Sequence, residues 1–169
     1  MHRFLITVAA LLVASLPAAA QAKVGIVDLN KAILGTAEIK KAQSDLEAKF
    51  KPRQDAMAKI DRELQQIQSQ LQTMAGKLTA QAEGDLQQQG ARKQRDLQRM
   101  NEDLQADVER ERNELLQKAG RQMLDVVKKM ADAKGLDMII DKANTLFIKD
   151  ALEVTADVIV AYDKAYPVK

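Results

Sequence analysis

MAKIDRELQQIQSQLQTM, residues 57–74, carries apolar side chains at alternating intervals of three and four residues. That spacing places them in one stripe along an α-helix, and a stripe flanked by glutamine and charge needs a facing helix. Two interleaved heptad series extend the stripe in both directions. The seam predicted from them consists of Phe50, Met57, Ile60, Leu64, Ile67, Leu71, Met74 and Leu78.

A second helical arm is predicted from about Leu86 to Lys134, where apolar residues recur every 11 residues instead of every seven. Eleven residues nearly follow a straight helix, whereas seven require left-handed wrapping. We therefore expect an antiparallel hairpin over residues 38–134, zipped along the seam of its first arm and splayed or curved elsewhere. Glycines place its tip within residues 76–84, with Thr79 as an N-cap. The partly unmatched residues of the second arm are candidates for contact with a bound partner: Leu86, Leu97, Met100 and Val108.

The rest of the chain is expected to form a small body at residues 23–37 and 135–169. A strand and a short helix open it, and Gly135 ends the second arm as a left-handed residue. LDMIID and TLFI, joined by residues 142–144, read as a β-hairpin before a last helix with Thr155 as a candidate N-cap. The first strand joins the others only if the long hairpin is an insertion. The predicted fold class is α+β, mostly α.

Three short strands and one helix make a poor core, so a homo-oligomer is expected. Association would cover the strand faces and edges that one copy leaves open. The residues assigned to this oligomer body are Val24, Ile26, Val27, Met138, Ile139, Ile140, Leu146, Phe147, Ile148 and Val158.

The first 22 residues have the pattern of a cleavable signal peptide: a short basic start, an apolar run and small residues in PAAAQA. Cleavage is expected after Ala22, with Ala20 as the alternative. The apolar run from Phe4 to Leu16 has 13 residues, short of the roughly 20 that span a bilayer. The chain is therefore expected to be exported.

Composition argues against an enzyme. Loss of Arg3 with the signal peptide lowers the net charge from +2 to +1, which predicts no nucleic-acid partner. The same cut removes the only histidine, His2, and the chain has no cysteine or tryptophan. The usual nucleophile–base pairs and the usual zinc ligands are thus missing, although carboxylates and lysines can still catalyse, and Gly76-Lys77 lacks the rest of a phosphate loop. We predict no catalytic, metal-binding or cofactor-binding residue.

Five weak motifs in order resemble the Skp/OmpH family of periplasmic chaperones over the whole mature chain. They are VGIVDLNKAI, EIKKAQSDLEAKFKPRQ, the long polar hairpin, VVKKMADAKGLDMIIDKANTLFI and EVTADVIVAY. The resemblance implies a jellyfish-like trimer, in which a β-rich body carries helical tentacles around a cavity. It also implies an ATP-independent holdase that binds unfolded outer-membrane proteins in the periplasm, with at most peripheral membrane contact and no cofactor.

By position, residues 24–27 match the family's first body strand, and 138–140 and 146–148 match its β-hairpin. Glu153 stands where the family has Asp at the start of the last helix. Residues 64–90 contain one cation and two anions, whereas the best-known members have cationic tips. This argues against a lipopolysaccharide site. The alternative is a periplasmic adaptor or spacer whose hairpin binds one folded partner.

Overall fold

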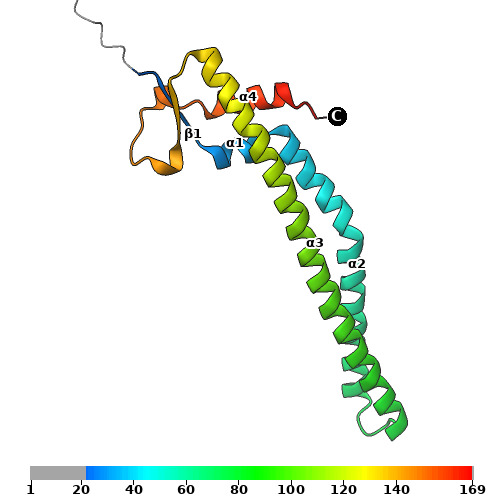
Figure 1. Ribbon diagram of the computed structural model, residues 1–169. Helices are drawn as coiled ribbons and strands as arrows, with labels where there is room; N and C mark the ends of the chain where they lie inside the picture. The colour runs from blue at the N-terminus through cyan, green and yellow to red at the C-terminus, as the bar shows by residue number, and fades with distance from the viewer. Residues whose placement is uncertain (1–21, 169) are drawn as a thin grey trace, which may run out of the picture.

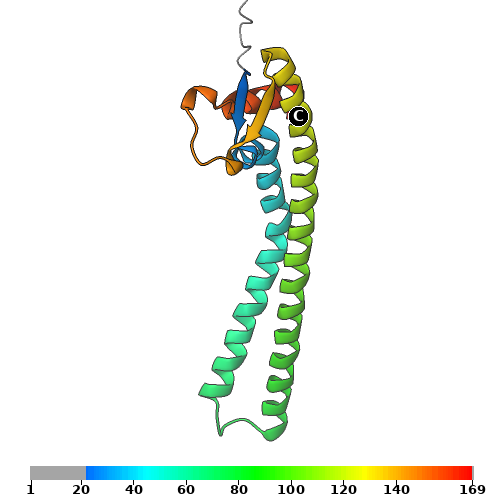
Figure 2. The same cartoon turned by 60° about the vertical axis from the view of Figure 1, so that its left-hand side comes forward.

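The chain runs out from a small α/β body along one long helix and returns along another (Figures 1 and 2). The computed structural model describes residues 22–168, so the expected signal peptide lies outside the described residues except for Ala22. The helices and strands are β1 (Val24–Val27), α1 (Leu29–Gly35), α2 (Ala37–Thr73), α3 (Ala80–Lys134), β2 (Met138–Asp141) and α4 (Thr155–Ala165). The α+β class with an inserted helical hairpin is thereby confirmed.

The two arms are α2 and α3. At about 1.5 Å per residue, their 37 and 55 residues reach about 55 and 80 Å. The turn occupies residues 74–79, and Gly76 adopts a positive φ of 75° there. The predicted tip therefore extended too far, because Thr79 caps α3 by accepting from the Ala82 N–H and residues 80–84 are already helical. Gly135, at φ 60°, ends α3 as predicted.

The sheet of the body contains β1 and β2, paired in parallel with Val24 opposite Met138 and Val27 opposite Asp141. Parallel strands need a long crossover, and the helical hairpin provides it. On the other side of β1, Ile26 forms a single parallel bridge with Glu153.

The predicted β-hairpin at 138–148 is wrong. The Asp141 carboxylate accepts from the Ala143 N–H, so it caps a 3₁₀ turn at Lys142–Asn144. This turn directs the chain away from β2 and toward the opposite edge of β1, where Glu153 pairs. Residues 146–148 belong to none of the strands in the described part of the chain.

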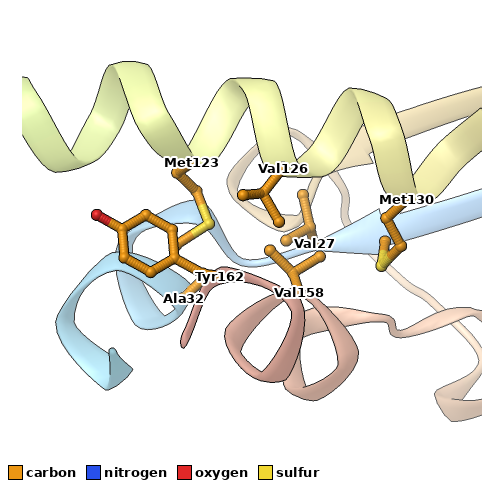
Figure 3. Close-up of a cluster of buried hydrophobic side chains, with 7 residues drawn as sticks. All are labelled: Val27, Ala32, Met123, Val126, Met130, Val158 and Tyr162. Carbon is orange, nitrogen blue, oxygen red and sulfur yellow. The ribbon is translucent and has the colours of Figure 1, made fainter. Parts of the chain in front are cut away.

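The core of the body lies where α1, α3, α4 and β1 meet (Figure 3). Its buried residues are Val27, Ala32, Met123, Val126, Met130, Val158 and Tyr162. The base of α3 therefore belongs to the body as much as to the hairpin.

Thr155 was expected to cap α4, but it is the first helical residue. Its hydroxyl instead accepts from the Asp28 N–H at 3.0 Å, which ties the start of α4 to the end of β1. The Asp28 carboxylate in turn caps α1 by accepting from the Lys31 N–H at 2.8 Å.

Candidate functional site

The predicted seam lies between the arms for most of its length. Phe50, Leu64 and Ile67 are buried. Met74, by contrast, is 44% exposed, because α2 ends at Thr73 and the chain turns away there. The half-buried members of the predicted seam are Met57, Ile60, Leu71 and Leu78.

The four second-arm residues predicted to contact a partner, Leu86, Leu97, Met100 and Val108, are half-buried rather than free. Three of them line open grooves between the arms. Leu97 lies in a groove of about 600 Å³ that Met57 also lines, and Val108 shares a cavity with Phe50. Leu86, Leu97 and Val108 therefore pack partly against α2 and leave part of their surface to a groove.

Two further residues of α3, Leu104 and Ala119, are buried. Sequence reasoning missed both as site residues, although both follow the 11-residue spacing. That spacing is the signal that could have found them.

An apolar cavity of about 270 Å³ opens near the base of the hairpin. Its apolar lining is Leu34, Ile39, Leu46, Phe50, Val108, Leu115 and Leu116, and Gln43, Glu47, Gln54 and Arg112 complete it. Leu46 and Leu115 also line a separate groove of about 510 Å³. The arms are thus loosely packed between Ile39 and Phe50, although both of these residues are buried.

Four ion pairs cross between the arms. Glu38 pairs with Lys118 at 2.7 Å and Lys49 with Glu111 at 2.5 Å; Arg53 pairs with Asp107 at 2.6 Å and Glu63 with Lys93 at 2.5 Å. Hydrogen bonds from Arg53 and Arg110 lower the pKa of Asp107, and a hydrogen bond from Lys93 lowers the pKa of Glu63. These pairs fit one antiparallel register and oppose slippage of one arm along the other.

A polar cluster joins both arms to the body at the base of the hairpin. The buried Tyr162 hydroxyl donates to Glu38 Oε2 at 2.5 Å and lies 2.9 Å from Gln122 Oε1. Figure 3 shows this hydroxyl pointing away from the apolar cluster. Lys118 donates to the other oxygen of Glu38 at 2.7 Å. We call Glu38, Lys118, Gln122 and Tyr162 the basal cluster.

The basal cluster shifts two pKa values. Burial by itself raises the pKa of Glu38, but the hydrogen bonds from Lys118 and Tyr162 outweigh it, so the net pKa is lowered. Burial and the hydrogen bond to Glu38 raise the pKa of Tyr162. The cluster is therefore arranged for an ionised Glu38 and a neutral Tyr162.

The predicted oligomer residues divide into three groups. Ile26, Val27 and Val158 are buried in the core of their own subunit. Met138, Leu146 and Phe147 are exposed, at 52%, 108% and 83%. The half-buried members are Val24, Ile139, Ile140 and Ile148. The exposed group is the part of the prediction that a neighbouring subunit can contact directly.

Among residues 22–168, no group of three or more acidic, histidine or cysteine side chains is placed to hold a metal ion. Within the same residues, no helix is both long and apolar enough to cross a membrane.

Two long antiparallel helices on a small α/β body define a class of proteins that project a helical hairpin. The chain belongs to the OmpH-like family of outer membrane proteins, whose family model matches residues 23–162.

A solved structure with the same fold is a candidate outer membrane chaperone (OmpH-like) from Caulobacter crescentus CB15. It superposes with a TM-score of 0.73 at 15% sequence identity, over 89% of each chain. At that identity the likeness concerns the fold alone. No curated protein matches the sequence.

Proposed function

We propose that this protein is a periplasmic holdase chaperone, which binds unfolded outer-membrane proteins without ATP and prevents their aggregation before membrane insertion. The observation that carries the proposal is the projecting hairpin, whose arms leave apolar grooves open along their length. Membership of the OmpH-like family supports it.

The physical task of such a chaperone follows from its clients. Unfolded strands of a membrane β-barrel expose apolar side chains and unpaired backbone groups, which aggregate in water. Helical arms satisfy their own backbone hydrogen bonds and therefore offer no sheet edge for a client strand to extend. Weak apolar contacts along the grooves hold the client. The client then passes to the outer membrane because the free energy of the client is lower there.

Assembly of three subunits is part of the proposal. The body of one subunit exposes Leu146 and Phe147, which are adjacent in sequence, beside its small sheet, and a contiguous apolar patch of this kind can mark a contact site. Three copies joined through this segment would place three hairpins around a shared cavity. In this proposal residues 38–134 form the tentacle, and residues 23–37 and 135–169 form the body.

The assembly can be tested by sedimentation of the mature protein. Replacement of Leu146→Asp together with Phe147→Asp is expected to give monomers, because the new carboxylates would be buried at the interface. Leu124→Asp, which changes a 59% exposed leucine on α3, is the matched control and is expected to leave the trimer intact. A double variant that still sediments as a trimer would exclude this segment from the interface.

The function is tested by diluting urea-denatured porin into buffer with the mature protein. Light scattering is expected to fall as the chaperone is added, with a soluble complex of defined mass. Scattering that does not change while the protein remains assembled would reject the holdase. Binding of one folded partner without any effect on scattering would favour the adaptor instead.

A further inference from the structure

The end of the hairpin differs in charge from its base. We call residues 64–90 the distal hairpin. Of these 27 residues only Lys77, Glu83 and Asp85 are charged, and nine are glutamine. Nearer the body, both arms carry closely spaced acidic and basic residues.

The contacts between the arms change at the same boundary. The cross-arm ion pair furthest from the body joins Glu63 to Lys93. Beyond it, within the described residues, the arms meet through apolar side chains: Leu64 and Ile67 are buried. A Cβ atom on Gly90 would lie 3.5 Å from Cγ2 of Ile67, so α3 approaches α2 closely there. Apolar contacts, and not ion pairs, therefore hold the two arms together in the distal hairpin.

A groove of about 300 Å³ follows the distal hairpin. Leu64, Ile67, Leu71 and Leu86 supply its apolar floor, and Gln68 and Gln87 are also in its lining. Such a groove has room for apolar side chains, with amide groups beside it that both donate and accept hydrogen bonds.

The two acids of the distal hairpin are engaged within α3. The Gln81 amide lies 3.3 Å from Asp85 Oδ1, and the Gln87 amide lies 3.2 Å from Glu83 Oε1. Both carboxylates lie close to the N-terminus of α3, where the helix dipole favours negative charge. They are therefore compensated locally and form no extended acidic surface.

We propose that the distal hairpin is a charge-neutral client-contact surface, selective for unfolded segments of low net charge with alternating apolar and polar residues. Strands of membrane β-barrels have this alternation. Their apolar side chains enter the groove, while their polar side chains and free backbone groups exchange hydrogen bonds with glutamine amides. A charged segment finds no opposite charge there and loses part of its hydration.

This inference rests on the proposed function and adds a distinct consequence, namely that client affinity depends little on salt. Electrostatic attraction weakens as the screening length falls from about 10 Å at 0.1 M to about 3 Å at 1 M salt. Apolar contact does not weaken under those conditions.

The test uses the assembled mature protein and three 20-residue peptides with one alternating Val/Thr pattern and a neutral fluorophore. One peptide is uncharged, one carries four Asp and one carries four Lys. Fluorescence anisotropy is expected to show tightest binding of the uncharged peptide, with less than about a twofold change in Kd between 0.1 and 1 M NaCl. Leu71→Gln with Leu86→Gln is expected to weaken it at least about fivefold with helicity retained.

A variant with added positive charge provides the second part of the experiment. Gln66→Lys, Gln70→Lys and Gln88→Lys, all at exposed distal positions, are expected to make the Asp peptide bind tighter at low salt only. The matched control places three lysines nearer the body, at the exposed positions Gln105, Asn113 and Gln117, and is expected to leave peptide preference unchanged.

The inference is overturned if the wild type prefers either charged peptide, if its affinity falls more than about tenfold with salt, or if no peptide binds. It is also overturned if the control lysines act as strongly as the distal ones. Suppression of porin aggregation measured on the same preparation separates the two proposals. If suppression persists alongside any of these results, only the neutral surface is rejected.

Discussion

Removal of one oxygen atom from the basal cluster tests how the arms are fixed to the body. Tyr162→Phe keeps the buried ring in the core but deletes the hydroxyl that donates to Glu38 and lies 2.9 Å from Gln122. A hydrogen bond to a charged group contributes about 1.5–3 kcal/mol, and Glu38 is 21% exposed. We therefore expect a loss of about 1–2 kcal/mol in the free energy of unfolding.

Circular dichroism during urea and thermal denaturation measures this loss. For a chain of this length, the expected change in Tm is about 2–8 °C. All variants must be compared at one protein concentration, because assembly contributes to apparent stability. Tyr166→Phe is the matched control: its ring lies 5.1 Å from that of Tyr162, and the described residues offer its hydroxyl no hydrogen-bond partner. If Tyr162→Phe is as stable as the Tyr166→Phe control, the proposed role of the basal cluster is refuted.

The pH dependence adds an independent check. The pKa of Glu38 is lowered from its ordinary value of 4.5, so the folded state favours the carboxylate. Its contribution is therefore present above about pH 4.5 and is lost as the pH falls through the lowered pKa. The difference between wild type and Tyr162→Phe should shrink below pH 4.5. A constant difference down to pH 3 would show that the hydroxyl acts without the charge of Glu38.

Three further predictions concern the arms. Gly135→Ala should lower the free energy of unfolding by about 1–2 kcal/mol in urea denaturation because Gly135 has a positive φ. Gly84→Ala, in open space inside α3, should instead raise the free energy of unfolding by about 0.5–1 kcal/mol. Equal effects of the two variants would contradict the left-handed cap. Lys93→Glu should lower the Tm by facing Glu63, and adding Glu63→Lys should restore it; no recovery in the double variant would reject the pairing. Thr79→Ala should cost about 1 kcal/mol in urea denaturation through loss of the cap of α3, and an unchanged stability would contradict the role of this cap.

The hairpin could be predicted from the sequence because its information is local. The stripe that begins at Phe50 predicted the first arm, although α2 ends at Thr73, before Met74 and Leu78. Thr79 and Gly135 were the predicted caps of the second arm, whose helix begins at Ala80 and not near Leu86. A cap acts within a few residues of its own position, so it can be read without the fold.

The sheet and the basal cluster could not be predicted in the same way. Leu146 and Phe147 have strand propensity, but the capped turn after Asp141 leads them away from β2. Tyr162 fitted the apolar side of the last helix, while its partner Glu38 lies 124 residues earlier. Such a pairing depends on the register of the arms and on their placement against α4, which the local pattern does not contain.

The parallel pairing of β1 with β2 has a consequence for the order of folding. Closing a flexible loop of about 110 residues costs about 4 kcal/mol in chain entropy, which two four-residue strands recover poorly. If α2 and α3 zip together first through local contacts, the ends of that loop are already neighbours and most of this cost has been met. If the chain is exported as proposed, the first strand has to stay unpaired until more than 100 further residues have crossed the membrane and the two arms have closed on each other.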